Sequence, residues 1–178
     1  ELILKNVGVN PTRDGIIKVL KAMGGDVEIL NYYNSFESVA DIRVKYSKLH
    51  ATTVSGDIIP TLIDEIPLIA AIASTAEGTT VIRDAAELKV KESNRIKVMC
   101  DELKKLGVNA VETEDGMEIT GGGRLVGDVQ INTHNDHRIA MTFAILNLIS
   151  EGEIHLDNPT CVDISYPEFF NDLKNVSV

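Results

Sequence analysis

Three short polar clusters contain the residue types that acid–base chemistry and anion binding use. Asp64 comes just before an apolar run that begins at Ile66, and the cluster 135–138 (Asn-Asp-His-Arg) comes just before another. The start of a helix carries unpaired N–H groups and a partial positive charge, so it can hold an anion or keep a carboxylate ionised. Asp64 fits the role of such a carboxylate, and Arg138, with His137 beside it, fits the role of an anion ligand.

Both clusters also have a purely structural interpretation. Asp64 is a suitable N-cap for a helix that starts near Pro67, and the 135–138 cluster suits a helix cap combined with a surface ion pair. The spacing alone leaves these alternatives open.

The third cluster is a small cationic island in an acidic protein. The stretch 83–97 has five basic and three acidic side chains, a net charge of +2, whereas the whole chain carries −10. A local positive excess favours the binding of a small anion, with Arg suited to bidentate contacts and Lys to point-charge contacts. Lys91, Glu92 and Arg95 lie here, and Glu92 is a second carboxylate for proton transfer. The alternative is an exposed loop with Ser93 as helix cap.

The histidines and cysteines do not indicate a metal site. His50 and His155 lie in strand-like segments and are interpreted as structural, while His134 and His137 are three residues apart without further ligands. The two cysteines form no CxxC pair, so neither a disulfide framework nor a zinc site is predicted. We expect a reducing, cytoplasmic compartment.

The elements that would position the clusters recur along the chain, at a period of roughly 75 to 85 residues. Each copy begins with a strand, a helix and a second strand. The first copy is predicted at 2–7, 13–23 and 26–30, the second at 79–83, 95–106 and 108–112, and the third begins at 153–156.

Two helices of another kind separate these copies. The runs 66–76 and 139–149 are apolar on nearly every side, so both helices should be buried all round. Each is preceded by a polar cluster at the same place in the repeat. The segment 112–120 has Asp115-Gly116 between alternating residues and predicts a β-hairpin.

We therefore predict an α/β (α+β) fold in which sheets cover buried helices. The chain should form a single globular unit over 1–178, with approximate repeats at 1–59, 60–131 and an incomplete 132–178. A hydrophobic content of 44% and a charged content of 25% are typical of ordinary globular proteins. The net negative charge makes nucleic-acid binding a poor expectation, and no apolar run approaches the ~20 residues that span a bilayer.

Four segments resemble the enolpyruvyl transferases, and within that family the branch that acts on shikimate-3-phosphate. They are 62–67 (LIDEIP), 83–96 (RDAAELKVKESNRI), 135–141 (NDHRIAM) and 165–170 (SYPEFF). The resemblance covers the whole chain and implies roughly the last two-fifths of the family's polypeptide. It implies repeated βαβαββ units, two globular halves with the active site between them, and a full-length protein that is a monomer.

The resemblance also implies the proton-transfer groups. Asp64 resembles the base that binds shikimate-3-phosphate and takes the proton from its 5-hydroxyl, and Lys91 resembles a lysine that contacts the same substrate. Glu92 resembles the acid–base group that protonates the methylene carbon of phosphoenolpyruvate and later removes a proton from the resulting methyl group. Phosphate then leaves.

By the same resemblance, Arg95 and Arg138 hold phosphoenolpyruvate with support from His137, and no metal or organic cofactor is implied. Two positions depart from the family. Ile164 stands where some members have a further phosphoenolpyruvate lysine, and Glu87 stands where some have an Asn that binds the shikimate.

The resemblance further implies that the other half of the polypeptide supplies substrate contacts, so the 178-residue chain alone should have no turnover. Two alternatives stay open: the sister transferase that acts on UDP-N-acetylglucosamine, and a non-catalytic scaffold domain of the same fold.

Overall fold

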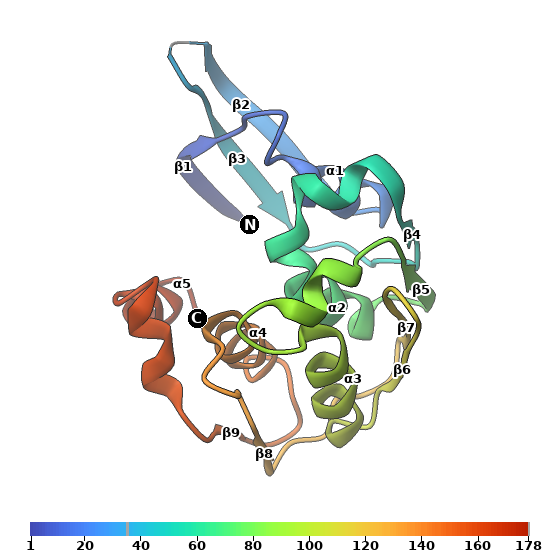
Figure 1. The fold of residues 1–178 in the computed structure, drawn as a ribbon. Helices are drawn as coiled ribbons and strands as arrows, with labels where there is room; N and C mark the ends of the chain where they lie inside the picture. The colour runs from blue at the N-terminus through green and yellow to red at the C-terminus, as the bar shows by residue number, and fades with distance from the viewer. Residues whose placement is uncertain (35, 178) are drawn as a thin grey trace.

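The computed structural model describes residues 1–34 and 36–177, which form short strands alternating with helices (Figure 1). The strands are β1 (Leu2–Gly8), β2 (Asp26–Asn34), β3 (Ser38–Lys45), β4 (Thr53–Val54), β5 (Gly78–Ile82), β6 (Asn109–Glu112), β7 (Met117–Gly121), β8 (Val129–Ile131) and β9 (Ile154–Leu156). The α-helices are α1 (Gly15–Ala22), α2 (Ile66–Thr75), α3 (Arg95–Lys105), α4 (His137–Leu146) and α5 (Phe169–Val176). Four 3₁₀ turns lie at Gly56–Thr61, Ile63–Glu65, Ala86–Val90 and Pro159–Ile164.

The strand pairing repeats along the chain. An antiparallel sheet has the order β1-β3-β2, and the same order returns as β5-β7-β6 in a second sheet. In that sheet β4 pairs in parallel with β5 across helix α2, and β8 pairs in parallel with β9 across helix α4. Element order and strand pairing thus recur together, whereas the boundaries 1–59, 60–131 and 132–178 stay a prediction.

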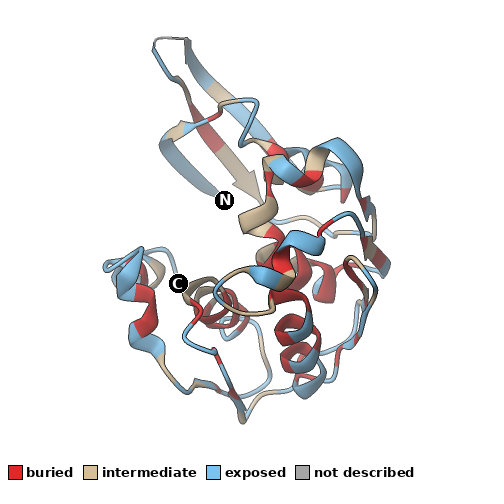
Figure 2. Ribbon diagram, viewed as in Figure 1, coloured by how far each residue is buried: buried red, intermediate tan, exposed pale blue. Residues whose placement is uncertain are grey.

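The main hydrophobic core lies around helices α2, α3 and α4, and Figure 2 shows most of the buried residues there. Ile66, Ile69 and Ile96 have no exposed surface, and complete burial of one such side chain contributes about 1.5–3 kcal/mol. A smaller core joins α1 to the first sheet, and a third joins α4 to the C-terminal segment. The helices that follow or begin at the polar clusters are therefore anchored in the core.

The prediction that 139–149 is one helix buried all round is wrong at its C-terminal end. Helix α4 stops at Leu146, and Leu148 and Ile149 are 52% and 57% exposed. The cause is Asn147, whose side-chain oxygen accepts the N–H of Ile154 at 2.7 Å and turns the chain toward β9.

The predicted hairpin is confirmed as β6 and β7, with Glu112 opposite Met117. Its turn needs glycine, because a Cβ on Gly116 would lie 1.9 Å from the carbonyl oxygen of Ile82. Three strands have no counterpart among the sequence predictions. They are β3, which has eight residues, and β4 and β8, which have two and three residues and offer too little alternation to detect.

The first sheet contains a buried carboxylate. Asp41 on β3 accepts hydrogen bonds from Asn31 Nδ2 at 2.9 Å, Lys5 Nζ at 2.9 Å and the N–H of Asn6 at 3.0 Å. Asn6 and Asn31 both have positive φ, and the pairing register of β1 and β2 with β3 shifts beside them. The bonds from Asn31, Lys5 and Asn6 lower the pKa of Asp41 from 3.8 to about 2.

We expect Asp41→Asn to lower stability at pH 7 and to reduce the acid sensitivity of folding. A carboxyl group whose pKa is depressed in the folded state stabilises the protein above the unfolded pKa, and this contribution disappears as pH falls from about 4 to about 2. Urea unfolding at pH 7 and pH 2.5 measures the difference. The difference in stability between the two proteins should be much smaller at the lower pH, and an equal difference at both values would contradict the assignment.

Candidate active site

Asp64 lies in the 3₁₀ turn before α2, and its carboxylate faces two arginines from other helices, Arg95 of α3 and Arg138 of α4. Oδ1 is 3.6 Å from Arg95 Nη1, and Oδ2 is 3.4 Å from Arg138 Nη2. Arg138 Nη1 also donates to the main-chain oxygen of Asp64 at 3.2 Å. The interpretation of Asp64 as a simple helix cap is wrong, because Glu65 holds the cap position of α2 and no side chain caps that end.

Arg95 is the centre of the cluster and is 1% exposed. Its Nε donates to Asp136 Oδ2 at 2.8 Å and its Nη2 donates to Asp136 Oδ1 at 3.2 Å, a bidentate pair. Nη2 also donates to Glu92 Oε2 at 2.6 Å. One buried guanidinium therefore joins carboxylates from the segments before α2, α3 and α4.

Two helix caps near Arg95 are expected as structural alternatives, one at Ser93 and one within 135–138. Asn94, not Ser93, caps α3 by accepting the N–H of Lys97 at 3.1 Å, and Ser93 instead donates to Asp136 Oδ2 at 2.9 Å. The alternative for 135–138 is correct for the cap, since Asp136 caps α4 by accepting the N–H of Arg138 at 3.0 Å, but wrong for a surface ion pair, because the pair of Asp136 with Arg95 is buried. Asp136 thus has both a capping role and an ion-pairing role.

The cationic island is not an open basic patch. Lys91 pairs with Glu87, and Lys97 lies 2.7 Å from Asp101. Glu92 keeps a side chain that is 51% exposed while it contacts Arg95. The carboxylate of Glu92 is thus the most accessible member of the Arg95 cluster.

A pocket of about 150 Å³ adjoins the cluster. Asp64 and Arg138 lie at its polar side, and the other lining residues are Glu65, Leu68, Met141, Thr142, Ile145, Tyr166 and Phe169. Two of these, Tyr166 and Phe169, belong to the C-terminal segment. His137 begins α4 and is half-buried, and Ile164 is 78% exposed on the segment that leads to Tyr166.

Sequence reasoning missed Arg13 in the loop before α1. Its Nη2 lies 3.6 Å from Asp64 Oδ2 and 3.3 Å from Glu65 Oε1, so a third arginine reaches the pocket's acidic side. Arg13 is 51 residues from Asp64 in the chain and follows no motif that connects the two.

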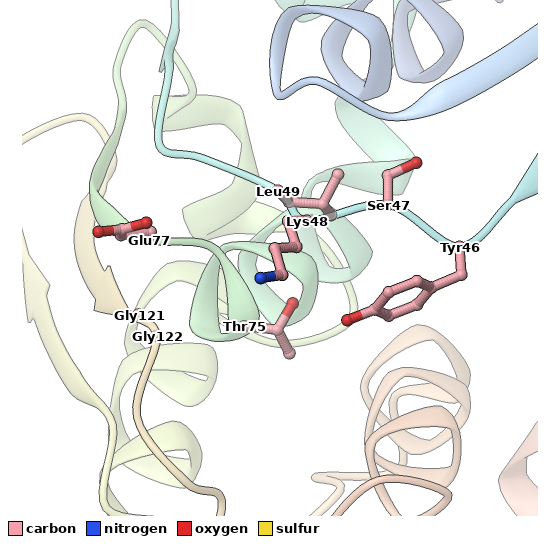
Figure 3. Close-up of a pocket in the computed structure, with 8 residues that line it drawn as sticks. All are labelled: Tyr46, Ser47, Lys48, Leu49, Thr75, Glu77, Gly121 and Gly122. Atoms are coloured by element: carbon pink, nitrogen blue, oxygen red, sulfur yellow. The ribbon is translucent and has the colours of Figure 1, made fainter.

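A larger pocket of about 470 Å³ lies at the opposite end of α2. Figure 3 shows the side chain of Lys48 above Thr75, with the ring of Tyr46 beside them and Glu77 farther along. None of the predicted site residues lines it, so Lys48 serves as a charged control position away from the cluster.

Within the described residues no group of three His, Cys, Asp or Glu side chains is arranged to hold a metal ion. No helix among them is long and apolar enough to cross a membrane. Both cysteines, Cys100 and Cys161, are free and buried.

We expect Cys100 to be unreactive in the folded protein. Burial raises the pKa of its thiol from 9.0 to about 11, and the thiolate is the reactive form. Labelling with a thiol-specific reagent at pH 8 should be about 100-fold slower than for an unfolded thiol. Equal rates in native buffer and in denaturant would contradict this.

Comparison with known proteins identifies the family. A sequence model described as EPSP synthase (3-phosphoshikimate 1-carboxyvinyltransferase) matches residues 1–173. The chain belongs to the EPSP synthase family. The 3-phosphoshikimate 1-carboxyvinyltransferase of Bacillus licheniformis is 52% identical over 178 residues, which is 99% of this chain and 42% of that protein. The protein of the same name from Thermoanaerobacter sp. (strain X514) is 54% identical over 171 residues, which is 96% of this chain and 40% of that protein.

Solved structures agree with the EPSP synthase assignment. A structure of EPSP synthase from Acinetobacter baumannii superposes with a TM-score of 0.93 at 41% identity, over 98% of this chain and 41% of that one. The enolpyruvyl transferase NikO from Streptomyces tendae has a TM-score of 0.72 at 20% identity and shares the fold. The predicted family and α/β fold class are confirmed, and the chain spans about two-fifths of the relatives' length.

Proposed function

We propose that this chain supplies the proton-transfer groups and two anion-binding arginines of an enolpyruvyl transfer from phosphoenolpyruvate to the 5-hydroxyl of shikimate-3-phosphate. The observation that carries the proposal is the convergence of Asp64, Glu92, Arg95 and Arg138 from three separate segments into one contact cluster. Two accessible carboxylates beside two guanidinium groups provide proton transfer and anion stabilisation in one place.

The first step is an addition. Asp64 takes the proton of the 5-hydroxyl while that oxygen attacks C2 of phosphoenolpyruvate, and Glu92 gives a proton to C3. The product is a tetrahedral ketal phosphate. In the second step Glu92 takes a proton back from C3, the C2–C3 double bond forms again, the C2–O bond to phosphate breaks, and Asp64 passes the hydroxyl proton to the departing phosphate. The protons balance over the two steps without a redox partner.

The cationic side chains hold the substrates. Arg95 and Arg138 would bind phosphoenolpyruvate with His137 beside them, and Lys91 would contact shikimate-3-phosphate. Arg95 is covered by Asp64 and Glu92, so an anion reaches it when one of these carboxylates shifts. When no substrate is bound, these carboxylates pair with the arginines in place of the substrate anion, so the buried positive charge keeps a partner.

The remaining three-fifths of the relatives' polypeptide is the proposed partner of this chain. Apolar side chains that stay 40% to 57% exposed support this, including Leu148 and Ile149 after α4 and Leu2 and Leu4 on β1. Large exposed apolar areas mark surfaces that another segment covers. We propose that the full-length polypeptide is a cytoplasmic monomer and that the 178-residue chain alone is inactive.

Phosphate release tests the proposal. The full-length enzyme, meaning the polypeptide of the relatives' length that carries this chain, is assayed with phosphoenolpyruvate and either shikimate-3-phosphate or UDP-N-acetylglucosamine. We expect release with the first acceptor only, and none from the chain alone. Release with UDP-N-acetylglucosamine would favour the sister transferase, and no release with either acceptor would favour a non-catalytic scaffold.

A further inference from the structure

Asp136 stands out among the residues to which no catalytic or binding role has been given. It is completely buried, and it is the partner of both proposed anion-binding arginines. Burial opposes its ionisation, but the hydrogen bonds and charge of Arg95, with further bonds from Ser93 and the Arg138 N–H, outweigh burial and lower the pKa of Asp136. The carboxylate is therefore ionised at neutral pH.

Its two oxygens face the arginines in different ways. Oδ2 accepts Arg95 Nε at 2.8 Å and Ser93 Oγ at 2.9 Å, while Oδ1 accepts Arg95 Nη2 at 3.2 Å and the backbone N–H of Arg138 at 3.0 Å. A bidentate contact fixes the plane of a guanidinium, and a cap bond fixes the first turn of a helix. One carboxylate thus sets the plane of the Arg95 guanidinium and the backbone from which the Arg138 side chain projects.

The hydrogen bonds leave one nitrogen of Arg95 uncommitted. Nη1 has only the 3.6 Å contact with Asp64, a distance too long for a hydrogen bond. Nε and Nη2 are both committed to Asp136. The Nη1 side of the guanidinium therefore points toward Asp64, which Arg138 contacts from its other side at 3.4 Å.

We infer that Asp136 is a positioning residue that aims Arg95 and Arg138 at a single anion, the phosphoenolpyruvate of the proposed function on which this inference rests. It touches neither substrate, and it moves no proton. Its contribution is to hold the two cations in place before the substrate arrives, which lowers the entropy lost on binding and orients the reactant.

The test measures both Michaelis constants in the full-length enzyme. Asp136→Asn keeps the shape but turns an N–H toward Arg95, so KM for phosphoenolpyruvate should rise about 10- to 100-fold, while KM for shikimate-3-phosphate changes less than about threefold. The matched control is Glu102→Gln, another buried carboxylate, which accepts Lys105 Nζ and the N–H of Asn132 and contacts neither arginine. It should leave KM for phosphoenolpyruvate within about threefold.

A double-mutant cycle separates positioning from general loosening. If Asp136 acts through Arg95, Asp136→Asn should add less than about threefold to the KM for phosphoenolpyruvate of an Arg95→Lys enzyme. Additive effects, or an equal rise of both Michaelis constants, would overturn the inference. If the unmutated enzyme releases no phosphate with shikimate-3-phosphate, the proposed function itself fails. This result is distinct from a failure of the inference about Asp136.

A measurement on the unmutated enzyme covers the case in which Asp136→Asn does not fold. The Arg95 Nε–H is bonded to a buried carboxylate, so its exchange with solvent, followed by NMR, should be slow both without and with saturating phosphoenolpyruvate. Rapid exchange in the presence of phosphoenolpyruvate would show that the substrate takes Arg95 away from Asp136, and the inference would fail.

Discussion

Replacement of Glu92 by glutamine should lower kcat of the full-length enzyme by about 10²- to 10⁴-fold. Glutamine keeps the size of the side chain and can still accept the hydrogen bond that Arg95 Nη2 gives to Oε2 at 2.6 Å, but it cannot deliver or accept the C3 proton. The loss should therefore appear in kcat rather than in the KM for shikimate-3-phosphate.

Isotope exchange gives this prediction a second measurement. In D₂O the unmutated enzyme should incorporate deuterium at C3 of phosphoenolpyruvate, because the addition is reversible, and Glu92→Gln should abolish the incorporation. Asp101→Asn is the control, since Asp101 is an exposed carboxylate on α3 that pairs with Lys97. Deuterium incorporation at the normal rate in Glu92→Gln would remove this residue from the proton transfer.

Replacement of Asp64 by asparagine should have a comparable effect, a loss of at least about 10²-fold in kcat. Among the described residues, Asp64 is the only carboxylate that lies within 4 Å of the guanidinium groups of both Arg95 and Arg138, so its substitution also removes the charge between them. An asparagine cannot take the 5-hydroxyl proton. Part of the lost rate should therefore return when an external base is added that can remove this proton.

The matched control for Asp64→Asn is Glu65→Gln, at the next residue of the chain. Glu65 has almost the same exposure as Asp64, 26% against 25%, and it pairs with the same Arg13, but it contacts neither Arg95 nor Arg138. Glu65→Gln should therefore keep kcat within about threefold. Equal losses in both variants would indicate that the acidic end of the pocket acts through its total charge, and Asp64 would lose its role as base.

Lys48→Ala provides a baseline for the whole series. Lys48 lies in the larger pocket beyond the C-terminal end of α2 and contacts no member of the cluster (Figure 3). Its substitution reports the effect of a charge removed far from the chemistry, against which every other variant can be compared.

Local features of the fold follow from the sequence. Asp115-Gly116 between alternating residues predicts the hairpin, and the structure shows that a Cβ at Gly116 would meet the carbonyl oxygen of Ile82. The apolar stripe of 95–106 predicts α3, and Gly107, with φ of +82°, ends it. Short strands such as β4 and the end of α4 at Leu146 escape prediction, since pairing across a parallel crossover and the bond from Asn147 to Ile154 decide them.

The candidate site also has features that follow from the sequence and features that only the tertiary structure shows. The sequence by itself determined which residue types occur before each core helix, and therefore which carboxylates and arginines the protein has for proton transfer and anion binding. Only the tertiary structure decided that Arg95 is buried, that Ser93 is not a cap, and that Arg13 reaches the pocket. The physical reason is that a buried charge requires a partner, and the partner of Arg95 is Asp136, 41 residues away along the chain and brought close only by the packing of α3 beside α4.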